Sequence, residues 1–177
     1  TQNDSEPWGP DFAPLNATQQ AAVRAALESW SDVANIQFVE VAETSSNVGT
    51  MRFAFTGYDI QGSADYAYYP GYWPNAGDVW INSEYINDTE WGLGSYHFST
   101  LVHEIGHALG LKHPFDSNDG NGTTLPLTED DTANSVMSYS ALNGNNGTYN
   151  VLEPSTAMAY DILTIQALYG ANTSHNS

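Results

Sequence analysis

The segment from His103 to Pro114, HEIGHALGLKHP, constrains the fold more than any other part of the chain. On an α-helix, His103 and His107 lie about one turn apart and share a face. The apolar residues of this stretch fall on roughly the opposite arc: Leu101, Val102, Ile105 and Leu109. We therefore expect a helix over 95–111 that presents one side to a core and its histidines to a cleft.

Gly110 explains how a third histidine can join this pair. If the helix continued, His113 would point about 140° away from His107. A glycine just past a helix can adopt the left-handed conformation and turn the chain sharply, and Pro114 prevents the helix from resuming. We expect this turn to return His113 to the face that carries His103 and His107.

Three neutral imidazoles around one metal ion leave a position open for water, which is the arrangement of catalytic rather than structural zinc. Glu104 is adjacent to His103 in the sequence. A carboxylate in that place is suited to act as a general base on the water. The pattern thus predicts one catalytic zinc ion held by His103, His107 and His113.

A His-His-Glu zinc site with Glu129 as the third ligand is the enzymatic alternative, but Gly110 and His113 stand in register for the three-histidine site and disfavour it. Two further histidines, His97 and His175, are out of this register, and we expect neither to be a ligand.

Charge and composition narrow the class of partner. The chain has 177 residues, with three Lys or Arg against 21 Asp or Glu and a formal net charge of −18. No cluster of cations exists to neutralise phosphates, which excludes generic nucleic-acid binding and a polybasic membrane patch. No apolar run of about 18 residues is present, so no membrane insertion is expected. Cysteine is absent, which excludes disulfides and Cys-ligated zinc.

The remaining sequence predicts a mixture of helices and strands. Asn16 and Gln19 form a capping-box start for an amphipathic helix that we expect to end near Ala34. Strands are expected at 36–41, 51–55, 64–69 and 78–82, and a last helix over 158–169. Without an internal repeat or an interior linker, residues 1–177 are expected to form a single domain.

The three-histidine motif, the later SVMSY around Met137 and the stretch DILTIQALYGAN near the end resemble the serralysin group of metzincin metalloproteases. The likeness runs from about Gly77 to Asn172, with a weaker match before it. It implies that His103, His107 and His113 bind zinc and that Glu104 is the base.

The same resemblance implies that Met137 packs beneath the zinc site and that Tyr139 can ligate zinc and then swing away to stabilise the transition state. A thioether gives an apolar floor, and a phenol can donate to a developing oxyanion, so the chemistry of both side chains agrees with these roles.

The implied fold is α+β and metzincin-like, with a twisted mixed, mostly parallel sheet, a long N-terminal helix, an active-site helix and a C-terminal helix. Two lobes, at about 1–110 and about 111–177, would enclose a zinc cleft. By position, the strand with Val79, Trp80, Ile81 and Asn82 matches the edge strand above the zinc, where an extended peptide can pair. An interior strand at this place is the alternative.

Departures from the family also set expectations. The Gly-rich nonapeptide array is absent, so we expect a catalytic domain alone, and Ser140 stands where a Trp commonly follows the turn tyrosine. The loop Asp116–Gly122 is rich in oxygen ligands and could bind calcium, although it lacks EF-hand spacing, and a solvated loop is the alternative.

The expected function is that of a secreted bacterial, monomeric zinc endopeptidase that hydrolyses extracellular proteins. Because of the acidic charge, we expect it to favour cationic or neutral peptides. Its own prosegment or a proteinaceous inhibitor could occupy the cleft. From another class, a non-catalytic calcium-stabilised binding or adhesin module is the alternative.

Overall fold

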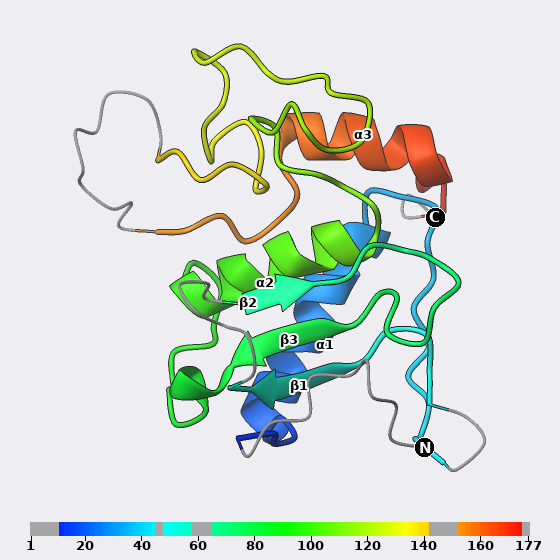
Figure 1. Cartoon of the computed structure of the whole chain (residues 1–177), viewed down its shortest axis with the longest axis vertical. Coiled ribbons are helices and arrows are strands. Elements are labelled where there is room, and N and C mark those ends of the chain that lie inside the picture. Colours follow the sequence, from blue (N-terminus) through cyan, green and yellow to red (C-terminus); the bar gives the residue numbers. More distant parts are fainter. Residues whose placement is uncertain (1–10, 45–47, 58–64, 142–151, 175–177) are drawn as a thin grey trace.

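The computed structural model describes residues 11–44, 48–57, 65–141 and 152–174. In chain order the elements are α1 (Ala17–Ser31), β1 (Phe53–Thr56), β2 (Asp65–Ala67), β3 (Val79–Asn82), the short 3₁₀ helix η1 (Ser83–Tyr85), α2 (Tyr96–Ala108) and α3 (Ala159–Tyr169). Figure 1 shows α1 and α2 beside a small sheet, with α3 and the long loops on the other side of α2. This mixture of helices and strands agrees with the predicted α+β class.

The N-terminal helix α1 begins where its capping signal predicts. Asn16 Oδ1 accepts from the backbone N–H groups of Thr18 and Gln19 at 2.9 and 3.1 Å, and Gln19 Oε1 accepts from Asn16 N at 2.8 Å. The helix ends at Ser31, three residues short of the expected end. The fully buried Trp30 donates its indole N–H to Val102 O at 3.1 Å, which fastens α1 to α2.

The sheet has the order β1-β3-β2. β1 pairs with β3 in parallel, with Phe53 opposite Val79, and β2 pairs with β3 in antiparallel, with Asp65 opposite Ile81. The sheet is therefore mixed, as predicted, but within the described residues it is not mostly parallel.

The predicted edge strand at 78–82 is wrong, because β3 is the central strand. Val79, Trp80, Ile81 and Asn82 are all buried, and β3 has a neighbour on each side. Its short apolar alternation reads the same for an edge strand as for a central one, so local sequence could not decide between them. β2 lies at one edge of the described sheet, on the side nearest α2 (Figure 1).

A second strand prediction also fails. Residues 36–41 form no strand within the described part of the chain. Ile36 and Phe38 are only half-buried against the core, whereas Val39 and Val41 are exposed. The alternation of apolar and polar residues at 36–41 thus reflects partial burial of side chains and not hydrogen bonding to a neighbouring strand. His175, which was expected not to be a ligand, lies outside the described residues.

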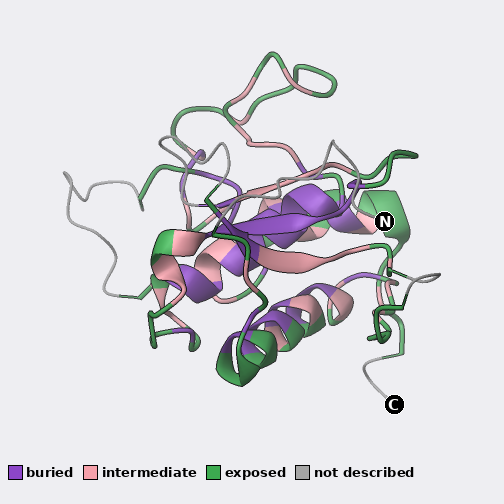
Figure 2. Cartoon of the chain, turned by 60° about the horizontal axis from the view of Figure 1, so that its bottom comes forward, coloured by how far each residue is buried: buried purple, intermediate pink, exposed green. Residues whose placement is uncertain are grey.

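The hydrophobic core lies between the sheet and the helices. Figure 2 shows the buried residues concentrated in the middle of the molecule, on the central strand and the neighbouring helix. The four apolar positions predicted to face the core from α2 are buried: Leu101, Val102, Ile105 and Leu109. Ile165 brings α3 into the same cluster, and Tyr169 OH donates to Leu109 O at 2.8 Å. No helix in the described ranges has the length and apolar character needed to cross a membrane.

Candidate metal centre

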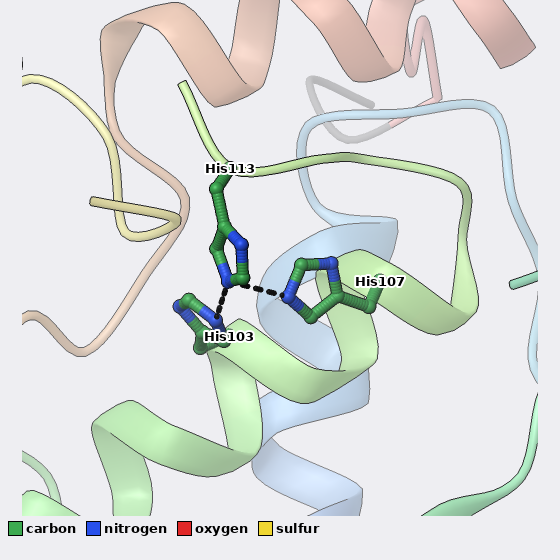
Figure 3. A group of neighbouring side chains, drawn as sticks. All are labelled: His103, His107 and His113. Carbon is green, nitrogen blue, oxygen red and sulfur yellow. Dashed lines mark hydrogen bonds between the residues drawn. The ribbon is translucent and has the colours of Figure 1, made fainter. Parts of the chain in front are cut away.

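The three predicted histidines converge at one point (Figure 3). His113 Nε2 lies 3.2 Å from His103 Nε2 and 3.0 Å from His107 Nε2. Two nitrogens bound tetrahedrally to zinc at about 2.0–2.1 Å would lie about 3.3 Å apart, so this spacing fits one shared ion. Among the described residues, this is the one group of three or more His, Asp or Glu side chains that could hold a metal.

Backbone carbonyls determine which nitrogen of each helical histidine faces the centre. His103 Nδ1 lies 2.8 Å from Val136 O, and His107 Nδ1 lies 2.7 Å from Leu111 O. A carbonyl oxygen can only accept, so each Nδ1 must carry the proton and donate it. Each Nε2 then presents a lone pair toward the centre, as metal ligation requires.

Burial keeps the histidines neutral. Desolvation is the largest cause that lowers the pKa of His103 to about 3 and that of His107 to about 4, and the neighbouring histidines lower that of His103 further. Burial also lowers the pKa of His113. Metal ions bind neutral imidazole, so protons compete little for these nitrogens at neutral pH.

The glycine turn forms as the sequence predicts. Gly110 has φ of 104°. Its N–H donates to His107 O and the N–H of Leu111 donates to Gly106 O, both at 2.9 Å, which together make a Schellman motif at the end of α2. The turn aims Leu111 O at His107 and brings His113 back over the helix.

Glu104 lies on α2 and is 5% exposed. Its Oε2 atom has no hydrogen-bond partner in the described structure. The pKa of Glu104 is raised to about 8, mainly by burial and in smaller part by the charge of Asp65. A buried carboxyl oxygen without a partner has the capacity to hold a water molecule or a proton.

Asp65 is a residue that sequence reasoning missed. It lies on β2, is 7% exposed and accepts from Asn82 N through Oδ1 at 2.8 Å. Burial raises its pKa to about 7, while the bond from Asn82 lowers it. The only signal in the sequence was an acidic residue in a stretch rich in tyrosine, where a strand was expected.

Met137 and Tyr139 differ in their exposure at the centre. Met137 is 1% exposed and packs against Gly106, between the two helical histidines. Tyr139 is exposed, and its ring centroid lies 5.5 Å from that of His103 and 4.5 Å from that of His113. Partial burial raises the pKa of Tyr139, with Glu104 adding to the effect, so its hydroxyl keeps its proton at neutral pH.

The alternative third ligand does not join the centre. Glu129 accepts from Tyr160 OH instead. His97 also lies apart, as predicted: its ring stacks on Trp91 at 4.5 Å and its Nε2 lies 2.9 Å from Asp88 Oδ2. The predicted edge-strand residues 79–82 are inside the sheet, and the backbone N–H of Asn82 donates to Asp65.

Calcium in the loop at 116–122 stays a prediction. Asp119 Oδ1 accepts from Gly120 N at 2.7 Å, and its other oxygen accepts from Tyr69 OH. Asp116 Oδ1 accepts from Asn118 N at 2.7 Å. Local hydrogen bonds thus already use three carboxylate oxygens of this loop.

Comparison with known proteins places these features in a family. The family model described as matrixin, peptidase M10, matches residues 11–136. The chain is 39% identical over 168 residues to serralysin C of Dickeya chrysanthemi. This alignment covers 91% of the present chain and 35% of serralysin C. The chain is 41% identical over 167 residues to serralysin A of the same organism, covering 91% and 34%, and 34% identical over 178 residues to serralysin of Photorhabdus luminescens, covering 96% and 36%.

The chain therefore spans about a third of the length of these curated relatives. The family match extends from the segment before α1 through the sheet, α2 and His113. The stretch that builds the histidine centre is thus the stretch that carries the likeness, and the chain belongs to the matrixin family of metzincins, with serralysins among its relatives.

Proposed function

We propose that this protein is a zinc-dependent endopeptidase. The observation that carries the proposal is the convergence of three histidine Nε2 atoms at 3.0 and 3.2 Å, next to a buried glutamate with an unpartnered oxygen. Zinc, when bound there, supplies a Lewis acid that polarises the scissile carbonyl and lowers the pKa of water toward about 7. His103, His107 and His113 would hold it.

Glu104 acts as the general base in this proposal. Its carboxylate accepts the proton of the attacking water and passes it to the nitrogen of the leaving amine. The unpartnered Oε2 supports this role, since no protein donor in the described structure competes for it.

Tyr139 assists at the oxyanion. Its ring stacks on that of His103 and lies tilted against that of His113, while its exposed phenol can reach a substrate carbonyl from the solvent side. A neutral phenol donates a hydrogen bond to the negative charge that develops on that oxygen. Met137 supplies an apolar floor that keeps the helical histidines in place.

The outer side of β2 aligns the substrate. Tyr68 on the same extended segment directs its N–H and C=O toward the residues just before β3: its N–H donates to Asp78 O, and its C=O accepts from Gly77 N. Alternate residues of an antiparallel strand turn these groups to opposite sides, so Asp65 and Ala67 direct theirs away from β3. An extended peptide bound along β2 would add a strand to this edge of the sheet, beside α2.

The proposed catalytic unit is one domain, with residues up to about 110 above the cleft and 111–177 below it. Its partners are peptide and protein substrates, and a prosegment or a proteinaceous inhibitor would occupy the same cleft. The family that this chain resembles is one of secreted proteases. We therefore propose that this protein also works outside the cell.

Metal analysis with a protease assay tests the proposal. We expect one zinc per chain by mass spectrometry and casein hydrolysis that a chelator abolishes and added zinc restores. His103→Gln should lose both the zinc and the activity. His97→Gln, a histidine of the same helix that is bonded to Asp88, is the matched control and should keep both. Absence of zinc from the wild type would contradict the proposal, and zinc without hydrolysis of any peptide would favour the binding-module alternative.

A further inference from the structure

Asp161 connects α3 to the segment that carries Met137. It lies in the first turn of α3 and is 2% exposed. Its Oδ1 accepts from Ser135 Oγ at 2.6 Å, and its Oδ2 accepts from Val136 N at 2.7 Å and from Met158 N at 2.8 Å. Burial of a carboxylate costs free energy unless several hydrogen-bond donors satisfy it. Here Ser135 and Val136 donate from the segment before Met137, and Met158 donates from the residue before α3.

The same Val136 peptide reaches the metal centre. While its N–H donates to Asp161, its carbonyl oxygen accepts from His103 Nδ1 at 2.8 Å. One residue thus joins the carboxylate of α3 to a ring of the histidine group. Ser135 strengthens the connection, because its Oγ also accepts from Met137 N at 3.1 Å.

We propose that Asp161 is a positioning residue of the metal centre, which holds the Val136 carbonyl where it fixes the tautomer and ring orientation of His103. This inference rests on the proposed zinc site. Groups behind a ligating histidine set its tautomer and basicity, and their loss weakens metal affinity about 10- to 100-fold. Asp161 does not contact His103 itself but acts through Val136. We therefore expect a loss of zinc affinity near the lower end of this range, about tenfold.

A purely structural role makes a different prediction. As the third residue of α3, Asp161 also satisfies Met158 N, as acidic residues in the first turn of a helix commonly do. If this were its only role, its removal would lower the stability of the fold but would leave the zinc affinity of folded molecules unchanged.

The test compares Asp161→Asn with Asp78→Asn, measured on folded protein well below the melting temperature. Asp78 is also a fully buried acid, but its carboxylate is paired with the guanidinium of Arg52. We expect Asp161→Asn to raise the zinc dissociation constant about tenfold, in competition with a chromogenic chelator, and to alter the visible spectrum of the cobalt-substituted protein. Asp78→Asn should lower the melting temperature with neither effect. Equal zinc affinity in Asp161→Asn and wild type would overturn the inference.

A measurement on the wild type covers the case in which Asp161→Asn does not fold. In the zinc-free protein, nitrogen NMR should find His103 as the Nδ1–H tautomer, with slow exchange of that proton and of the Val136 amide. The Nε2–H tautomer, or fast exchange of either proton, would contradict the inference. Failure of the wild type to bind zinc would instead contradict the proposed function, so the two failures are distinguishable.

Discussion

Met137 Sδ lies against the bare backbone of Gly106, so closely that an alanine Cβ at that position would be 2.5 Å from the sulfur. The same Cβ would lie 3.2 Å from Trp30 Cζ2. Both neighbours are buried, so neither has free space into which it can move. The glycine between His103 and His107 is therefore required by the methionine beneath the helix rather than by the backbone of the helix itself.

Gly106→Ala should destabilise the fold. Overpacking typically costs about 1–3 kcal/mol, and the better helix propensity of alanine returns about 1 kcal/mol. We expect a net loss of up to about 2 kcal/mol in urea unfolding, together with weaker zinc binding. Gly92→Ala is the control, since its Cβ would meet nothing within 4 Å. Wild-type stability in Gly106→Ala would show that Met137 has another place to go.

Glu104→Gln should separate metal binding from turnover. The amide keeps the shape of the side chain but cannot take up a proton, so kcat should fall about 10²- to 10⁴-fold while zinc content stays at the wild-type level. Glu28→Gln, an exposed substitution on α1, should leave both unchanged. Turnover in Glu104→Gln close to that of wild type would remove Glu104 from the mechanism.

Tyr139→Phe should lower kcat with little change in KM. The phenylalanine ring keeps the contacts with His103 and His113, so only the hydroxyl is lost. Removal of one oxyanion donor typically costs about 10²- to 10³-fold in kcat. Stability should change by less than about 0.5 kcal/mol, because the side chain is exposed. A raised KM with unchanged kcat would indicate a role in binding alone.

Salt should slow the cleavage of cationic peptides. The three cations are already engaged: Arg24 with Glu40, Arg52 with Asp78, and Lys112 with the carbonyls of His113 and Asp116. The formal charge of −18 is thus left to attract positive substrates. Raising ionic strength from about 0.01 to about 1 M shortens the Debye length from about 30 to about 3 Å. We expect kcat/KM to fall several-fold for a Lys-rich fluorogenic peptide and to stay constant for an uncharged one; equal responses would leave the charge without a role in substrate choice.

The histidine centre was predictable because its determinants are local. Helical spacing places His103 and His107 on one face, and Gly110 turns the chain within three residues of His113. No contact with a distant part of the chain is needed to foresee that geometry. The position of Met137 was foreseen in another way, through the likeness to a family, because nothing local links it to Gly106.

Strand order and the supporting acids could not be predicted in this way. The place of β3 between β1 and β2 depends on pairing between segments that are distant in the sequence. Asp65 and Asp161 bond to backbone N–H groups of Asn82 and Val136, which carry no side-chain signature. A carboxylate whose partner is a remote backbone group has no motif, so only the folded structure reveals it.

Asp65 should make the metal-free protein less stable as pH rises. Its pKa is raised from 3.8 to about 7 on folding, mainly by burial, so the folded state holds this proton more tightly than the unfolded state. The resulting stability is fully present below about pH 4 and is lost as pH rises through about 7. Within that window one such group changes the unfolding free energy by up to about 1.4 kcal/mol per pH unit.

Asp65→Asn tests this effect with little change of shape, because its amide oxygen can still accept from Asn82 N. In urea unfolding of chelator-treated protein, the variant should gain stability relative to wild type between pH 5 and pH 8. Part of the gain comes from Glu104, since the charge of Asp65 contributes to its raised pKa. Glu28→Gln should follow the wild-type curve, because its side chain is exposed on α1. Parallel curves for Asp65→Asn and wild type would mean that Asp65 does not enter the fold as a buried acid with a raised pKa.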